Sequence, residues 1–277
     1  MRTVTLPSGE EVPVLGQGTW RMGESSSRRN LEIAALRSGL DLGLSVIDTA
    51  EMYADGGAEK VVGEAITGRR EEVFLVSKVL PQHATEAGTI KACERSLARL
   101  RTDRLDLYLL HWPSNIPLEA TLSGFASLVA AGKIRYWGVS NFDVRDMEEV
   151  MSLRGGNAVA TDQVLYNLGR RGIEQDLLPW CAERHIPMMA YSPIEQGRML
   201  KRPELKEIAA RRGATPAQVA LAWVLSREGV IAIPKMGSVE HVEENQGALK
   251  LSLASEELAE LDVAFPLPTQ KVGLEVL

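Results

Sequence analysis

Four ionisable side chains come at or just behind the ends of short apolar runs that have the length of buried strands. They are Asp48, with Tyr53 on the loop behind it, and then Lys78 and His111. A free tyrosine has a pKa of about 10 and is a poor acid at neutral pH. An adjacent ammonium from Lys78 is expected to stabilise the phenolate and lower this pKa, while Asp48 keeps the ammonium charged.

His111 completes this set because it can donate a hydrogen bond to a substrate oxygen. A tuned proton donor beside such a group suits carbonyl reduction, in which an alkoxide is protonated as it forms. The hydride must come from a cofactor. Each residue also has a structural explanation, such as a helix cap for Asp48 or a surface lysine for Lys78. Their succession at consecutive strand ends favours a joint catalytic role.

The elements that must position these side chains alternate between strands and helices. Strands are expected over 15–18, 45–47, 73–77, 105–110, 134–139, 158–162, 187–190 and 230–233. Helical patterns cover 28–41, 58–67, 89–100, 117–130, 144–153 and 173–184, and two further helices, 204–212 and 215–227, precede the last strand. Eight alternating units predict an α/β fold, a (β/α)₈ TIM barrel. An N-terminal β-hairpin is expected over 3–15, and residues 1–277 form a single domain.

In such a barrel, the residues at the strand ends gather at one rim, where the chemistry takes place. This rim is predicted to carry a polar ring. Its members are Thr19, Trp20, Asp48, Lys78, His111, Ser140, Asn141, Gln163, Tyr191 and Lys235.

Composition excludes several classes of partner. The net charge is -6, and the sequence shows no basic stripe that could bind nucleic acid. The sequence has no signal-like N-terminus and no apolar run of about 18 residues, so no membrane partner is expected and a cytoplasmic location is predicted. Cys93 and Cys181 lie apart without a CxxC pattern, which makes a disulfide or zinc site improbable and buried thiols the expectation.

Six motifs, at 48–53, 75–78, 106–113, 138–142, 190–193 and 233–235, resemble those of the aldo-keto reductases in order and along nearly the whole chain. The resemblance implies an oxidoreductase with a barrel that binds NADPH or NADP⁺, with NADH possible, without a Rossmann domain. It implies that Tyr53 is the general acid/base, that Lys78 and Asp48 tune it, and that His111 orients the carbonyl.

The resemblance also implies a set of cofactor contacts. They are Thr19, Trp20, Ser140, Asn141, Gln163, Tyr191, Ser192, Lys235, Ser238, His241, Glu244 and Asn245. One position departs from the family pattern, which usually has arginine where this sequence has His241. Because histidine is largely neutral near pH 7, the preference for NADPH over NADH rests on Lys235 and Ser238.

The substrate pocket is expected to be open and tolerant, because the segments 194–203 and 263–277 are short for loops that close over a site. Its walls are predicted to include Trp20, Met52 and Trp112. The expected partner is a small-molecule carbonyl substrate, and the protein is expected to be a monomer or a weak homo-oligomer.

Three alternatives belong to other classes. Related barrels also serve as ion-channel accessory subunits, in which cofactor binding regulates and turnover is slight. A Schiff-base aldolase could use Lys78 as a nucleophile, although a neighbouring carboxylate would keep the amine protonated. A metal-dependent hydrolase is disfavoured, because the four histidines form no HxH strand motif and no metal site is predicted.

Overall fold

The computed structural model describes residues 2–277, and its centre is a sheet of eight parallel strands in chain order. The strands are β3 (Gln17–Gly18), β4 (Val46–Asp48), β5 (Phe74–Val79), β6 (Leu105–Leu110), β7 (Ile134–Ser140), β8 (Val159–Leu165), β9 (Met188–Tyr191) and β10 (Val230–Ile233). The last strand returns to the first through parallel bridges from Leu15 to Ala232 and from Gly18 to Lys235. The sheet therefore closes, and the predicted (β/α)₈ barrel is confirmed.

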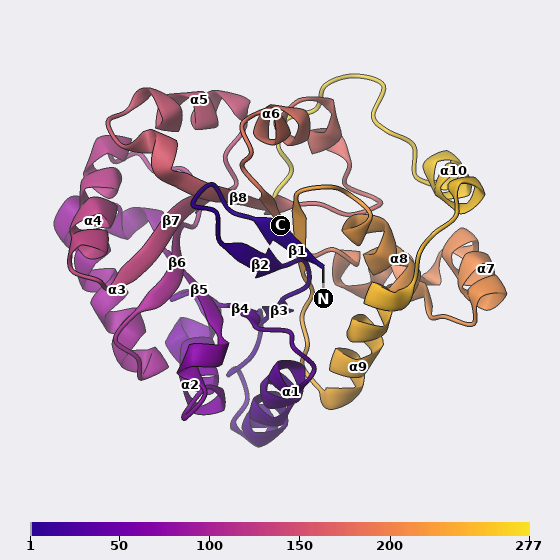
Figure 1. Cartoon of the computed structure of the whole chain (residues 1–277), viewed down its shortest axis with the longest axis horizontal. Coiled ribbons are helices and arrows are strands. Elements are labelled where there is room, and N and C mark those ends of the chain that lie inside the picture. The colour runs from indigo at the N-terminus through magenta and orange to yellow at the C-terminus, as the bar shows by residue number, and fades with distance from the viewer. Residues whose placement is uncertain (1) are drawn as a thin grey trace.

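Helices surround the strands (Figure 1). They are α1 (Arg29–Asp41), α2 (Gly57–Ala65), α3 (Glu86–Leu100), α4 (Leu118–Ala130), α5 (Val144–Ser152), α6 (Leu177–Glu183), α7 (Pro203–Arg212), α8 (Pro216–Leu225), α9 (Val239–Gly247) and α10 (Ser255–Ala264). No helix within residues 2–277 has the length and apolar character needed to cross a bilayer.

Alternation along the strands divides the apolar residues into two layers. In β6, Leu107 and Leu109 belong to the cluster inside the barrel, whereas Tyr108 and Leu110 belong to the larger cluster between barrel and helices. Both faces of these strands are therefore buried, which explains why they read as continuous apolar runs.

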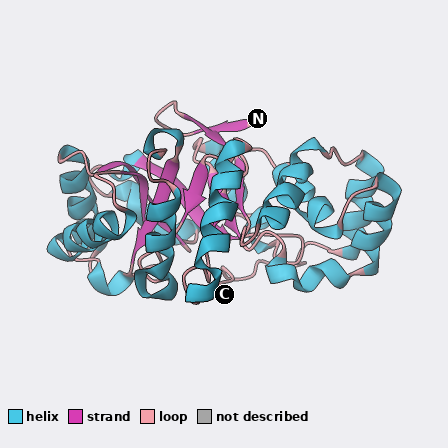
Figure 2. Cartoon of the chain, turned by 90° about the horizontal axis from the view of Figure 1, so that it is seen from below, coloured by secondary structure: helices cyan, strands magenta, loops and turns pink. Residues whose placement is uncertain are grey.

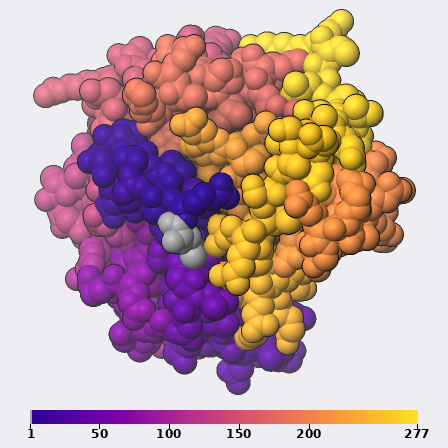
Figure 3. Space-filling view, turned by 45° about the vertical axis from the view of Figure 1, so that its right-hand side comes forward, coloured from indigo at the N-terminus to yellow at the C-terminus, as the bar shows by residue number. Residues whose placement is uncertain are grey.

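The N-terminal hairpin, β1 (Thr3–Thr5) and β2 (Glu11–Pro13), is confirmed and covers one end of the barrel. Its Leu6 and Val12 pack into the interior cluster. At its turn, Glu10 accepts a hydrogen bond of 2.7 Å from the Tyr136 hydroxyl. The C-terminus lies at the end of the barrel opposite to the hairpin (Figure 2). The hairpin itself forms part of the molecular surface (Figure 3).

Several predicted boundaries differ from the structure. Helix α3 begins at Glu86 rather than at residue 89, because the Thr85 side chain caps it by accepting from the Gly88 amide. Helix α6 begins only at Leu177, after a 3₁₀ turn, η6 (Gly172–Gln175). The strands β5 and β8 run further than expected, so that some predicted rim residues lie within strands.

Candidate active site

Lys78 and Asp48 form a buried ion pair at the mouth end of the barrel. Both side chains continue the inward-facing positions of their strands, after Val76 in β5 and Val46 in β4. Lys78 Nζ donates to both carboxylate oxygens of Asp48 at 2.8 Å and to the Thr49 carbonyl at 2.9 Å. The ammonium is therefore fully hydrogen-bonded although its side chain is 0 % exposed.

Tyr53 is held directly above this pair. It begins a 3₁₀ turn, η2 (Tyr53–Gly56), and its backbone amide donates to the Ala50 carbonyl at 3.1 Å. The next residues, Ala54 and Asp55, both have left-handed backbone angles, a strained geometry that is common at functional sites. The phenol oxygen lies 3.3 Å from Lys78 Nζ, which brings a proton-bearing hydroxyl to the ammonium.

The direction of the Tyr53 pKa shift corrects the prediction from sequence. Burial and the negative charge of Asp48 raise the pKa of Tyr53 well above 10, although Lys78 was expected to lower it. Burial also lowers the pKa of Lys78, and Asp48 opposes that shift. The predicted lowering was wrong because desolvation is the largest effect on the phenol and the charge of Asp48 acts in the same direction. Tyr53 therefore keeps its proton at neutral pH.

His111 follows β6 and stands beside the phenol. The ring centroids of Tyr53 and His111 are 5.8 Å apart in an edge-to-face arrangement. Burial and the nearby Lys78 charge lower the pKa of His111 to about 2, so its imidazole is neutral. A neutral imidazole carries one N–H group. It is therefore suited to donate a hydrogen bond to an oxygen rather than to act as an imidazolium acid.

A second buried carboxylate, Glu59, acts on the ion pair and was not predicted from the sequence. Glu59 on α2 accepts from the Ser77 hydroxyl at 2.6 Å and from Nε of Arg99 at 2.5 Å. Its negative charge supports the protonated form of Lys78. The available signal was its place on the apolar face of α2, between Ala58 and residues that pack into the core.

An irregularity in β8 decides which of two neighbouring polar residues faces the site. The pairing of β7 with β8 shifts between Trp137 and Val139, which inserts an extra residue into β8. After this bulge, Gln163 pairs with Ser140 and faces the interior, while Asp162 faces the helices. Gly138 makes the bulge possible, because a Cβ there would approach the Thr161 carbonyl to 2.6 Å.

Ser140, Asn141 and Tyr191 form one connected group on the wall opposite Asp48. The Ser140 hydroxyl donates to the Gln163 carbonyl at 2.7 Å, and the Tyr191 hydroxyl donates to the Asn141 side chain at 2.9 Å. Asn141 also donates to the His111 carbonyl at 3.0 Å. Its left-handed backbone, with φ of 61°, turns the side chain back toward the strand ends. Ser140 and Asn141 do not cap α5, because Asp143 caps that helix.

Aromatic residues form part of the wall around Tyr53. Trp20 is 41 % exposed and its ring centroid lies 5.0 Å from that of Tyr53, while the ring of Trp112 lies 4.9 Å from that of His111. Met52 is half-buried beside Tyr53 in the chain. Thr19 is buried, and its hydroxyl donates to the Asp48 carbonyl at 2.9 Å. Its side chain therefore links the ends of β3 and β4.

The remaining predicted cofactor residues lie on the segment after β10. Ser238 caps α9 by accepting from the His241 amide at 3.3 Å, and His241 is exposed. Glu244 is half-buried and Asn245 buried on the same helix. Lys235 lies just before this helix, and its Cε is 3.3 Å from the position that a Cβ atom on Gly237 would occupy. Ser192, which follows β9, accepts through its carbonyl from Asn167.

The position of Lys235 beside Gly237 is the observation that tests the fit of a phosphorylated cofactor. A Cβ atom on Gly237 would lie 4.0 Å from Lys235 Nζ, and no ion pair involving Lys235 occurs among residues 2–277. Desolvation lowers the pKa of Lys235; the charge of Glu32 opposes this shift and the charge of Arg28 adds to it. A cation that makes no direct ion pair and lies beside a small residue suits an anionic group, so these residues fit a phosphate.

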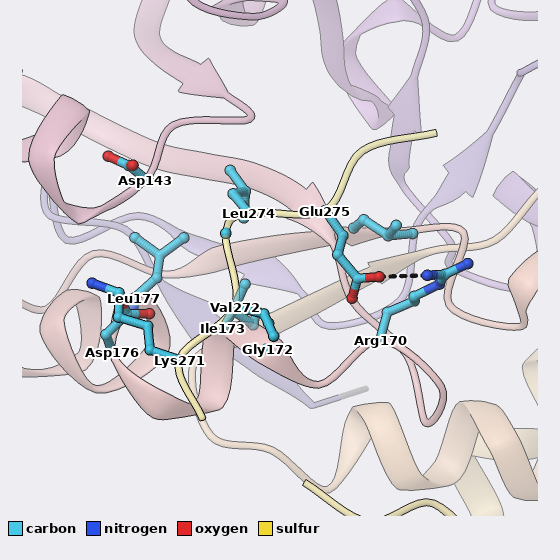
Figure 4. A pocket seen from close by; sticks show the side chains of 12 residues that line it. Asp143, Arg170, Gly172, Ile173, Asp176, Leu177, Lys271, Val272, Leu274 and Glu275 are labelled. Carbon is cyan, nitrogen blue, oxygen red and sulfur yellow. Dashed lines mark hydrogen bonds and ion pairs between the residues drawn. The ribbon is translucent and has the colours of Figure 1, made fainter. Parts of the chain in front are cut away.

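The C-terminal tail lies along η6 on the β8 side of the mouth. Glu275 pairs with Arg170, and Lys271 Nζ lies 2.7 Å from Asp176, around a small cavity (Figure 4). The backbone of Leu277 lies beside the Tyr191 hydroxyl. The tail therefore reaches the site, although segment 263–277 was expected to be short for a loop that closes over it.

Comparison with known proteins agrees with this geometry. Residues 14–264 match the model of the Aldo/keto reductase family. The chain is 56 % identical to methylglyoxal reductase YeaE of Escherichia coli over 271 residues, which is 96 % of this chain and 95 % of that protein. It is 34 % identical over 263 residues to a glyoxal reductase of Bacillus subtilis, covering 94 % of this chain and 91 % of that one.

Solved structures give the same result. An aldo/keto reductase from Klebsiella pneumoniae in complex with NADP and acetate superimposes with a TM-score of 0.97 and 52 % identity, over 100 % of this chain and 99 % of that one. The accessory-subunit alternative finds no support among these relatives. The motifs, the closed barrel and the family match agree, and the chain belongs to the aldo/keto reductase family.

Proposed function

We propose that this protein reduces small aldehydes and ketones to alcohols with NADPH. The observation that carries the proposal is the Tyr53 hydroxyl 3.3 Å from an ammonium that Asp48 holds in place, at the mouth of the barrel. Family membership and the Klebsiella structure that contains NADP support the cofactor. When bound, the nicotinamide supplies the hydride that adds to the carbonyl carbon.

Tyr53 serves as the proton donor to the carbonyl oxygen. Its raised pKa keeps the hydroxyl protonated until the substrate oxygen becomes an alkoxide, which is a far stronger base. The phenolate that forms lies next to Lys78, whose ammonium then stabilises it. In the reverse direction the same phenolate accepts the proton from an alcohol.

His111 orients the substrate oxygen. Its Nδ1 is buried without a partner, which leaves Nε2 as the ring nitrogen that serves the mouth. A neutral ring with its proton on Nε2 donates a hydrogen bond to the carbonyl oxygen without competing with Tyr53 as an acid. The two donors together hold the carbonyl in one orientation.

Asn141, Gln163 and Tyr191 are proposed to hold the nicotinamide ring, with Ser140 behind them. The amides of Asn141 and Gln163 suit a carboxamide, and Tyr191 offers a flat ring face for stacking. Thr19, Trp20 and Ser192 border this position. Lys235, Ser238, His241, Glu244 and Asn245 are proposed to hold the adenosine end, with Lys235 facing the phosphate.

The substrate class is proposed from the relatives and from the wall of the mouth. The E. coli relative is named a methylglyoxal reductase and the B. subtilis relative a glyoxal reductase. The wall formed by Trp20, Met52 and Trp112 is apolar. Tyr53 and His111 are the two proposed hydrogen-bond donors to the carbonyl oxygen. Small 2-oxoaldehydes fit such a site. A cytoplasmic location and a monomeric or weakly associating state remain predictions.

The test measures NADPH oxidation by near-ultraviolet absorbance with methylglyoxal, glyoxal, an aromatic aldehyde and a simple ketone. The proposal expects turnover of all four substrate types, with the highest kcat/KM for the 2-oxoaldehydes. NADPH binding is measured separately by its fluorescence. A protein that binds NADPH but reduces none of these carbonyls would contradict the proposal.

A further inference from the structure

Arg28 ends the 3₁₀ turn η1 (Ser26–Arg28) that leads into α1, and its guanidinium approaches Gly237, as Lys235 does. A Cβ atom placed on Gly237 would lie 3.9 Å from Nη2 of Arg28 and 4.0 Å from Nζ of Lys235. The two cationic nitrogens therefore approach one small volume. They are separated by no more than the sum of these two distances. Segments far apart in the sequence bring them together.

Arg28 forms only a long ion pair with the nearby carboxylate of Glu32. The closest contact, from its Nε to Glu32, is 3.9 Å, which is too long for a hydrogen bond. The other oxygen of Glu32 accepts from the Gly23 amide at 2.9 Å. Within residues 2–277 the guanidinium of Arg28 makes no hydrogen bond, and its side chain is 56 % exposed.

Arg28 and Lys235 share one neighbouring carboxylate, Glu32, so the pair of cations keeps an excess positive charge that favours an anion between them. A phosphate monoester is the anion that suits an arginine and a lysine, since the guanidinium binds two oxygens and the ammonium a third. Gly237 has no side chain, so no Cβ occupies the position that both cations approach. His241 is exposed and, unlike arginine, is not a permanently charged residue.

We propose that Arg28 binds the 2′-phosphate of NADPH together with Lys235, and that it thereby makes this protein select NADPH over NADH. This inference rests on the proposed function, since it assumes that the adenosine end lies between β10 and α9. It assigns to the loop before α1 a specificity role that His241, in place of arginine, does not fill.

The experiment compares the dissociation constants of NADPH and NADH, measured by fluorescence, for the wild type and three variants. Arg28→Gln keeps hydrogen-bonding capacity and removes the charge. Lys235→Gln is the reference for loss of a phosphate contact. Arg154→Gln is the matched control, because Arg154 is exposed just before β8, at the end of the barrel where the strands begin.

Arg28→Gln is expected to raise the Kd of NADPH roughly tenfold, as loss of a charge-assisted hydrogen bond does, and to leave the Kd of NADH within about twofold. Arg154→Gln is expected to change neither constant. The ratio of the two constants isolates the 2′-phosphate, because NADH lacks only that group. A merely structural role for Arg28 would weaken both cofactors alike.

Three results would overturn the inference. If Lys235→Gln weakens NADPH but Arg28→Gln does not, the assignment of Arg28 is wrong and the proposed function stands. Equal weakening of NADPH and NADH by Arg28→Gln would place the residue elsewhere on the cofactor or in the fold. If the wild type binds neither dinucleotide, the proposed function itself fails.

Discussion

Nε2 of Gln163 donates a hydrogen bond of 2.8 Å to Oδ1 of Asp48 across the interior of the barrel. Their strands, β8 and β4, are four positions apart in a closed ring of eight, so they face each other across its diameter. The carboxylate thus receives one donor from Lys78 and another from the wall proposed to hold the nicotinamide. The proton-donating side and the cofactor side of the site are linked through a single carboxylate.

Removing the Tyr53 hydroxyl tests the role of the proposed proton donor. Tyr53→Phe is expected to lower kcat roughly 10²-fold or more, because it removes the hydroxyl that is proposed to protonate the alkoxide. NADPH binding is expected to persist, since the ring remains. Steady-state reduction of methylglyoxal and NADPH fluorescence measure the two effects. Retention of more than about a tenth of the rate would assign the proton to another donor.

Asp48→Asn tests the buried ion pair. The substitution leaves the ammonium of Lys78, which is 0 % exposed, without its counter-charge, and is expected to lower the free energy of unfolding by about 3 kcal/mol. The double variant Asp48→Asn with Lys78→Met removes both charges and is expected to recover much of that stability but no activity. Urea unfolding gives the first quantity and NADPH oxidation the second. If the double variant is no more stable than the single one, the unpaired charge is not the cause.

The buried neutral imidazole of His111 makes stability depend on pH. Its pKa is about 2 in the folded protein, compared with about 6.5 in an unfolded chain. Above the unfolded-chain value of about 6.5, His111 is unprotonated in both the folded and the unfolded state. As the pH falls below it, only the unfolded chain takes up the proton, so the free energy of unfolding decreases by about 1.4 kcal/mol per pH unit.

The variant His111→Asn removes this proton uptake. Urea unfolding between about pH 7 and pH 5 is expected to show a shallower pH dependence for the variant than for the wild type. Parallel curves would mean that His111 is protonated in the folded protein. The comparison uses slopes, so a change in stability from the substitution itself does not affect it.

Asp162 has the opposite linkage. Burial raises its pKa well above 3.8, and the backbone amides of Phe142 and Gln163 oppose the shift only weakly, because neither carboxyl oxygen reaches hydrogen-bonding geometry. The folded state therefore holds a proton that the unfolded chain has lost. The free energy of unfolding decreases as the pH rises from about 4 through the folded pKa.

The isosteric variant Asp162→Asn cannot ionise. Relative to the wild type it is expected to gain stability steadily as the pH rises above about 4, by as much as 1.4 kcal/mol per pH unit until the folded pKa is reached. Thermal or urea unfolding over a pH series measures this difference. A constant difference at all pH values would show that the folded carboxyl is ionised like an exposed one.

The sequence by itself determined the barrel and the positions of the four residues that are proposed to be catalytic. Eight apolar runs separated by helical patterns have few other ways to bury both faces of every strand. Asp48 and Lys78 continue the inward-facing positions of β4 and β5, and His111 follows β6, so local periodicity was sufficient to place them at one rim. Tyr53 required only a short loop behind β4.

The tertiary structure decided what depends on contacts between distant segments. The bulge in β8 turns Gln163 inward and Asp162 outward, and no periodicity in the sequence indicates an extra residue there. The pKa of Tyr53 depends on the sum of burial, Asp48 and Lys78, whose balance requires the assembled site. Arg28 meets Lys235 only because the barrel closes β10 against β3. Sequence patterns report local conformation, whereas charge balance and cross-barrel contacts exist only after closure.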